Sequence, residues 1–163
     1  MDHSFGMLCF SRRSDNPVQW SHYADHHRGI CLGFDVPDRL LTRVSYTAKR
    51  LVADAERLIA GHQMDQATID RLLSTKYSHW RYENEVRQLV PLQTSIVENG
   101  RYFIPYSENL ALRQVFVGAS STVTRAELGD ALGELSGSVQ THKSRLAFRT
   151  FRVVRQRAES LWR

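Results

Sequence analysis

The chain has 163 residues, of which 42% are hydrophobic, 24% charged and 10% aromatic. This length suits one domain with a substantial core, and the composition excludes disordered, collagen-like and coiled-coil proteins. The net charge of +5 is uneven, because residues 141–163 carry seven basic side chains and one acidic side chain, which leaves −1 for the other 140 residues. The basic charge therefore belongs to one end of the chain and not to the whole molecule.

The sequence lacks the signals of export and of membrane insertion. No apolar run approaches the roughly 20 residues that span a bilayer, and Met1 is not followed by the basic and apolar segments of a signal peptide. Cys9 and Cys31 lie in apolar stretches and belong to no CxxC pair, which argues against a disulfide framework and a cysteine zinc site. We expect a cytoplasmic protein with no membrane partner, and its oligomeric state stays open.

The first part of the chain predicts a strand, a helix and a second strand. Residues 7–11 are apolar enough for a short buried strand. Asn16 and Pro17 are an N-cap residue and a first-turn proline, so a helix follows, and we expect it to end near Gly29. Residues 29–35 are nearly all apolar, which predicts a central strand.

Helical spacing dominates the next segment. Over residues 41–47 the two faces of a strand alternate imperfectly, which predicts a further strand. Over residues 48–80 the apolar residues recur with the period of helices. Gly61 separates two predicted helices. Asp65 is the expected N-cap of the second, which is predicted to continue to Trp80.

The last half of the chain alternates strands, turns and one helix. Residues 83–91 predict a strand, and Asn99–Gly100 is the strongest hairpin signal in the sequence. A strand is expected at 113–118, a helix with a capping box over 124–137, and strand over 144–157. We therefore predict an α+β fold in a single domain, residues 1–163, with a mixed or split β-sheet of about five to seven strands and about four helices. Residues 141–163 form its basic C-terminal strand or tail.

Acidic and basic side chains gather after Trp80. On a strand, Glu83, Glu85 and Arg87 would lie on one face with successive carboxylates about 7 Å apart. A carboxylate with a perturbed pKa on a rigid strand is suited to act as a general base or to stabilise a developing cation. The alternative is a solvated sheet face on which Arg87 pairs with Glu85.

The sequence offers little support for a metal site or for the common enzyme motifs. His22 and His26 would share one face of the first helix, but two imidazoles without an HExxH pattern make an incomplete site, so we predict no metal ligands. The sequence contains no P-loop, no GxGxxG, no GxSxG and no kinase motif, which argues against those enzyme classes.

The ordered set of polar and aromatic residues between positions 9 and 118 resembles the bacterial family called domain of unknown function 2971. The residues that carry this resemblance are Cys9-Phe10-Ser11, Trp20-Ser21-His22-Tyr23-Ala24, His27-Arg28-Gly29, Phe34-Asp35, Lys76, Trp80, Tyr82-Glu83, Glu85, Arg87 and Val115 to Gly118. Members of that family usually carry a further segment before the Cys-Phe-Ser strand, so the resemblance implies a shortened or divergent member.

The order of elements also resembles that of ADP-ribosyltransferases, which implies an NAD-using transferase in a toxin or phage-defence role. By this resemblance Glu85 would be the catalytic carboxylate, Glu83 would assist a protein or nucleic-acid acceptor, and Ser11 would line the nicotinamide pocket. His22 and Tyr23 are assigned to the same cofactor site. Lys76, Trp80 and Arg87 are assigned to its support.

Two other functions stay open. One is a metal-dependent nuclease with Glu83, Glu85, Lys76 and a histidine around a divalent ion. The other is a module without chemistry that binds nucleic acid through its Arg-rich end, where phenylalanines alternate with basic residues. The competing interpretation of that end is an edge strand protected by its arginines, with the phenylalanines in the core. The residues concerned are Arg145, Phe148, Arg149, Phe151, Arg152 and Arg155.

Overall fold

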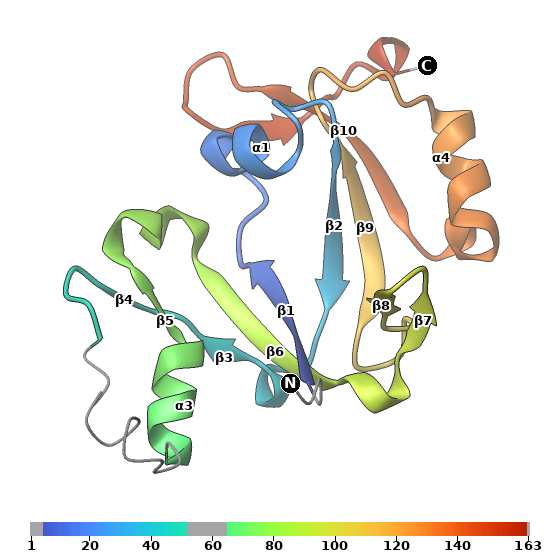
Figure 1. Ribbon diagram of the computed structural model, residues 1–163. Helices are drawn as coiled ribbons and strands as arrows, with labels where there is room; N and C mark the ends of the chain where they lie inside the picture. Colours follow the sequence, from blue (N-terminus) through green and yellow to red (C-terminus); the bar gives the residue numbers. More distant parts are fainter. Residues whose placement is uncertain (1–4, 52–64, 163) are drawn as a thin grey trace. The chain divides into compact units, whose positions relative to one another are not determined.

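The computed structural model describes residues 5–51 and 65–162 (Figure 1). The described residues combine helices with several small sheets, which confirms the predicted α+β class. They group into two compact units: Met1–Arg12 with Arg39–Gln93, here unit 1, and Arg13–Asp38 with Thr94–Arg163, here unit 2. The first of the two helices predicted over 48–80 lies mostly outside the described residues.

Unit 1 is built on an antiparallel sheet of order β1-β6-β3. Its strands are β1 (Phe5–Ser11), β6 (Glu85–Pro91) and β3 (Thr42–Arg43). Directly opposite residues on paired strands share a sheet face. Ser11 therefore lies beside Glu85, and Cys9 beside Arg87.

The rest of unit 1 supports the start of β6. Strand β4 (Ser45–Thr47) pairs in parallel with β5 (Thr75–Tyr77), and 3₁₀ helix η2 (Ser78–Glu83) connects β5 to β6. The strand predicted over 41–47 is divided between two sheets. The division falls at Val44, which is buried and whose amide donates to the Glu85 carbonyl.

Helix α3 (Gln66–Leu73) begins as predicted and ends early. The Asp65 carboxylate accepts from the Thr68 amide at 2.8 Å, which confirms the N-cap. The predicted extension to Trp80 is wrong, because the segment after Ser74 pairs with β4 as a strand and tertiary pairing overrides the helical period.

Unit 2 holds a four-stranded sheet of order β11-β10-β9-β2 (Figure 1). The strands are β2 (Ile30–Asp35), β9 (Ala111–Val117), β10 (Gln140–Leu146) and β11 (Val153–Arg155), and only β9 and β10 are parallel. The prediction that residues 29–35 form a central strand is wrong, since β2 lies at the edge of this sheet. Its alternate residues Ile30 and Leu32 are exposed, whereas Cys31 and Phe34 pack on the two cores.

The sheet of unit 2 has an apolar cluster on each face. One contains Val115, Val117 and Leu128 of helix α4 (Arg125–Leu132), together with Trp162. The other joins Trp20 to Val153 and Phe116. The capping box predicted at the start of α4 is confirmed by reciprocal Thr124 and Glu127 bonds, and the helical path closes at Gly137 through 3₁₀ helix η4 (Gly133–Gly137).

Helix α1 (Pro17–Tyr23) starts at the predicted cap, where the Asn16 side chain accepts from the Val18 amide at 2.9 Å. It ends six residues before Gly29. Residues 25–27 all have left-handed backbone with φ between 42° and 69°. His26 therefore lies outside the helix, and the predicted face shared with His22 is wrong.

Two hairpins belong to unit 2. Asn99 and Gly100 both have positive φ and join β7 (Ile96–Glu98) to β8 (Arg101–Phe103), as predicted. The strand predicted over 144–157 is instead two strands, β10 and β11. Their turn is closed by the bond from the Ala147 amide to the Arg152 carbonyl. The remaining 3₁₀ helices are η1 (Asp38–Leu40), η3 (Leu92–Thr94) and η5 (Glu159–Leu161).

Candidate functional site

Unit 1 contains a group of two buried carboxylates and two half-buried cations, here called the carboxylate cluster: Lys76, Glu83, Glu85 and Arg87. Lys76 Nζ contacts Glu83 Oε2 and lies 3.0 Å from Glu85 Oε2. Arg87 Nε lies 2.8 Å from Glu85 Oε1. Glu83 and Glu85 are only 4% and 7% exposed. Two carboxylates and two cations thus neutralise one another inside the unit.

Backbone and hydroxyl contacts hold the carboxylate cluster in place. The Ser11 hydroxyl donates to the Glu83 carbonyl at 2.7 Å, and the Glu85 amide donates to the Tyr46 hydroxyl at 2.9 Å. Arg87 also donates to the Leu73 carbonyl at the end of α3. The cluster therefore ties β1, β4, α3 and β6 together.

The pairing controls the charge states of the cluster. Burial by itself raises the pKa of Glu85, but hydrogen bonds from Arg87, Lys76 and Cys9 outweigh it and lower the pKa to about 2. Burial likewise lowers the pKa of Lys76, and its two carboxylate partners more than reverse this, so the pKa rises above its ordinary value. Both groups are ionised at neutral pH.

Most of the predicted catalytic and supporting residues meet here, by a different geometry from the one expected. Glu83 does not lie on the strand: it ends η2, and the left-handed backbone of Asn84, with φ 46°, separates it from β6. Its carboxylate reaches the cluster through Lys76. Trp80 also lies close, with its ring centroid 5.3 Å from Lys76 Nζ.

Cys9 and Tyr46 are contacts of the cluster that sequence reasoning missed. Burial raises the pKa of the Cys9 thiol, and the hydrogen bond to Glu85 adds to the effect. The register of β1 on β6 is the signal that places Cys9 there. His22 and Tyr23 belong to unit 2, where both are exposed on α1.

A second candidate site is the turn between β10 and β11, here called the hairpin tip: residues 145–152. Phe148 and Phe151 are 92% and 99% exposed. The Arg145 guanidinium lies 4.6 Å from the Phe148 ring centroid. The interpretation that these phenylalanines belong to the core is therefore wrong.

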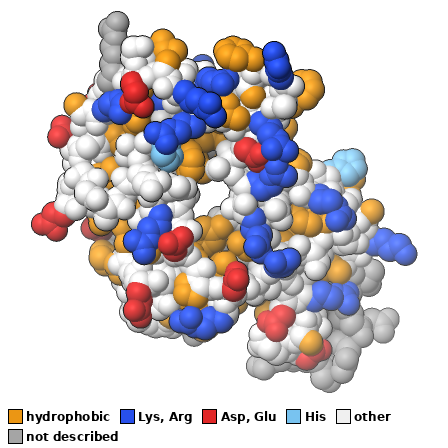
Figure 2. Space-filling model, turned by 180° about the vertical axis from the view of Figure 1, so that it is seen from behind, with side chains coloured by type: hydrophobic (Ala, Val, Ile, Leu, Met, Phe, Trp, Pro, Cys, Tyr) orange, Lys and Arg blue, Asp and Glu red, His pale blue; other side chains and the backbone are white. Residues whose placement is uncertain are grey.

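The charges of the hairpin tip are little compensated within the described residues. Arg152 Nε lies 3.6 Å from a carboxylate oxygen of Asp15, and the Arg145 guanidinium donates to the Leu146 carbonyl at 3.0 Å. Arg149 is exposed. In Figure 2 the hairpin lies at the upper right, where basic and hydrophobic side chains are adjacent on the surface.

Within residues 5–51 and 65–162, no group of three or more His, Cys, Asp or Glu side chains is placed to hold a metal ion. No helix in the same ranges has the length and apolar character to cross a bilayer.

The model of the family described as Protein of unknown function (DUF2971) matches residues 19–88. This match confirms the resemblance found in the sequence. It covers α1 from Gln19 onward, β2 and the whole carboxylate cluster, whereas the hairpin tip lies beyond it. Searches of curated proteins and of solved structures gave no significant match.

Proposed function

We propose that the protein binds single-stranded nucleic acid through the hairpin tip. The observation that carries this proposal is the nearly complete exposure of Phe148 and Phe151, at 92% and 99%. Apolar rings of this size are normally buried, and exposed ones that gather on a surface mark an interaction site. These two rings stand at the ends of a four-residue turn closed by the Ala147–Arg152 hydrogen bond.

The chemistry of the tip matches both parts of a nucleotide. Exposed bases stack on aromatic rings whatever their sequence, and each such contact is worth about 1–3 kcal/mol. Arg145, Arg149 and Arg152 are interleaved with the two rings, so phosphates that follow each stacked base find a cation within the same loop. A flexible single-stranded nucleic acid can stack its bases on the two rings and place its phosphates beside the arginines. A duplex cannot do so, because its bases are stacked on one another inside the helix.

A membrane surface is the competing partner for exposed phenylalanines beside arginines. Insertion into lipid is favoured when apolar and charged side chains occupy separate faces. At the hairpin tip they alternate, and Arg145 lies over the Phe148 ring that would have to insert. The arrangement therefore favours nucleic acid.

The test is the affinity for a single-stranded oligonucleotide, measured by fluorescence anisotropy with the wild-type chain and with Phe148→Ala/Phe151→Ala. We expect the double variant to bind at least tenfold more weakly, because two stacking contacts are lost. Its melting temperature should stay unchanged, since both rings are almost fully exposed.

The control is Tyr102→Ala/Phe103→Ala on β8, which removes two half-exposed aromatic rings from the other hairpin of unit 2. This variant should bind as the wild type does. Equal affinities for all three chains would overturn the proposal, and so would binding to anionic vesicles but not to the oligonucleotide.

A second proposed function is the NAD-dependent transfer of ADP-ribose with Glu85 as the catalytic carboxylate. It is favoured by one observation: Ser11 on β1 lies directly opposite Glu85 on β6, and Glu83 and Lys76 join them. A fixed, ionised carboxylate stabilises the oxocarbenium charge that develops when nicotinamide leaves. Both carboxylate oxygens of Glu85 are already in ion pairs. An incoming ribose must therefore share a Glu85 oxygen with Lys76 or Arg87, or displace one of these two cations.

Nicotinamide release from NAD, with and without cell extract, tests this second function. Release by the wild type and none by a folded Glu85→Gln variant would support it. If the wild type neither releases nicotinamide nor changes its melting temperature when NAD is added, the second proposed function is contradicted.

A further inference from the structure

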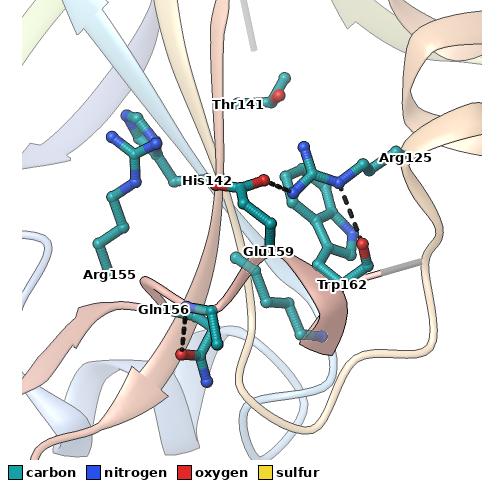
Figure 3. A pocket seen from close by; sticks show the side chains of 9 residues that line it. Arg125, Thr141, His142, Arg155, Gln156, Glu159 and Trp162 are labelled. Carbon is teal, nitrogen blue, oxygen red and sulfur yellow. Dashed lines mark hydrogen bonds and ion pairs between the residues drawn. The ribbon is translucent and has the colours of Figure 1, made fainter.

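Two arginines in the described part of unit 2 lie over aromatic rings, and the two pairs differ in what the ring can still contact. Arg125 lies over the Trp162 indole, with its guanidinium carbon 4.4 Å from the ring centroid. Figure 3 shows this guanidinium joined to Glu159 and to the Trp162 carbonyl. Trp162 is only 6% exposed and belongs to the core. The Arg125–Trp162 pair is therefore a structural contact whose ring is not available to a ligand.

The pair at the hairpin tip has the opposite surroundings. The guanidinium carbon of Arg145 lies 4.6 Å from the Phe148 ring centroid, yet Phe148 is 92% exposed. Within the described residues, no carboxylate lies at ion-pair distance from Arg145. Because Phe148 stays almost fully exposed, its contact with Arg145 adds little to the stability of the fold. The ring face opposite Arg145 is left to a ligand.

The two rings of the hairpin tip are therefore not equivalent as stacking surfaces. Arg145 covers one face of Phe148, so a base can stack only on the other face. Phe151 is 99% exposed, and both of its faces are accessible. Arg145 itself is on β10, where its backbone lies opposite Val154 of β11. The sheet, and not the turn, thus fixes the backbone of the residue that supplies the cation behind Phe148.

A cation behind an aromatic ring changes which bases stack well on its open face. The π electrons make each face of the ring negative, and a cation held over one face attracts them. The opposite face becomes less negative, so it repels the electron-rich π surface of a base less. Purines are larger and richer in π electrons than pyrimidines, and differences in stacking strength are the usual source of base preference in single-strand binding.

We propose that the hairpin tip prefers purine bases at Phe148 and that Arg145 is the residue that sets this preference. The inference rests on the proposed binding of single strands and adds the class of base to it. Arg149 lies in the same loop, and among the described residues it makes no cation–π contact. Arg149 therefore attracts phosphates equally for every base, whereas Arg145 also acts on the base through the Phe148 ring.

The test compares the affinities for oligo(dA) and oligo(dT) of equal length, measured by fluorescence anisotropy at one salt concentration. Loss of a phosphate contact weakens both affinities by the same factor, so their ratio reports the effect on the base alone. We expect Arg145→Gln to lower the ratio of dA to dT affinity about threefold, as expected for the loss of an exposed cation–π contact. The matched control, Arg149→Gln, should weaken the binding of both oligonucleotides and leave the ratio unchanged.

A double-mutant cycle assigns the preference to one ring. In a Phe148→Ala chain, Arg145→Gln should leave the ratio unchanged, whereas in a Phe151→Ala chain it should still lower it. Arg145 is half-buried, so melting curves are measured for every variant. If Arg145→Gln does not fold, the two exposed rings decide the question: Phe148→Ala should lower the ratio more than Phe151→Ala does.

The outcomes separate this inference from the function on which it rests. Equal changes of the ratio in Arg145→Gln and Arg149→Gln, or no change in either, would overturn the purine preference and leave single-strand binding in place. A fall caused by Arg145→Gln that persists in the Phe148→Ala chain would overturn the assignment to Phe148. A wild-type chain that binds neither oligonucleotide would overturn both proposals.

Discussion

Lys76 is the side chain on which the charge balance of unit 1 depends. It is the only described cation that contacts both Glu83 and Glu85. Moving a charged group out of water costs several kcal/mol, and this cost is offset only when each charge keeps its partners. The removal of Lys76 would take one ion pair from each of the two buried carboxylates.

We therefore expect Lys76→Met to lower the free energy of unfolding by roughly 3 kcal/mol or more. Chemical denaturation followed by tryptophan fluorescence measures it. Lys49→Met makes the same change at an exposed lysine and should cost less than about 0.5 kcal/mol. A similar cost for the two variants would contradict the assigned role of Lys76.

Glu85 makes the stability of the protein depend on pH. Its pKa is about 2 in the folded chain, below the ordinary 4.5, so the unfolded chain takes up a proton first as the pH falls. The stabilisation is complete above about pH 5 and is lost as the pH falls towards 2, with a total of about 3 kcal/mol. Glu85→Gln should flatten that part of the curve of unfolding free energy against pH, and Glu134→Gln, at an exposed position on η4, should leave it unchanged.

The grouping of Lys76, Glu83, Glu85 and Arg87 could be predicted from the sequence because they lie within twelve positions. The alternative interpretation, in which Arg87 pairs with Glu85, is confirmed for the pair and wrong for the solvated face, since Glu85 is buried. The burial could not be predicted, because it depends on β1 and β4, which come from distant parts of the chain. The contacts of Cys9 and Tyr46 are of the same kind: they follow from strand register, which single-sequence periodicity does not contain.

At the scale of elements, the arginines of the hairpin tip determine how binding responds to salt. Each phosphate contact on a single strand adds about 0.7 to the slope of log affinity against log salt concentration. Arg145→Gln/Arg149→Gln should therefore lower the slope by about 1.4 in anisotropy titrations at several salt concentrations. The same change at two exposed arginines elsewhere, Arg101→Gln/Arg113→Gln, should leave the slope as in the wild type. An unchanged slope in Arg145→Gln/Arg149→Gln would contradict the phosphate contacts proposed for these two arginines.

Elements that begin at a strong local signal were predicted well. Asn16, Asp65 and Thr124 cap the helices that follow them, and Asn99–Gly100 makes the expected hairpin. The ends of α1 and α3 were missed, because left-handed residues stop the first and strand pairing stops the second. Composition over 144–157 indicated strand but could not show that Phe148 and Phe151 stand in a turn.

At the scale of the whole molecule, the uneven charge of the sequence has a structural counterpart. The last 23 residues supply the arginines of the hairpin tip. The carboxylate cluster belongs to unit 1 and is neutral within itself. Unit 1 has 10 basic and 7 acidic residues and unit 2 has 12 and 10, so both units share the net charge of +5, and the basic character of the last 23 residues is a local property of one part of unit 2.

Photocrosslinking to an oligonucleotide that contains 5-iodouracil, followed by mass spectrometric mapping of the adducts, tests the binding of single strands most directly. Aromatic rings that stack on bases are the expected sites of attachment. We expect adducts at Phe148 and Phe151, the two exposed rings of the hairpin tip. Adducts concentrated on peptides outside residues 145–152, or none in the presence of saturating oligonucleotide, would contradict it.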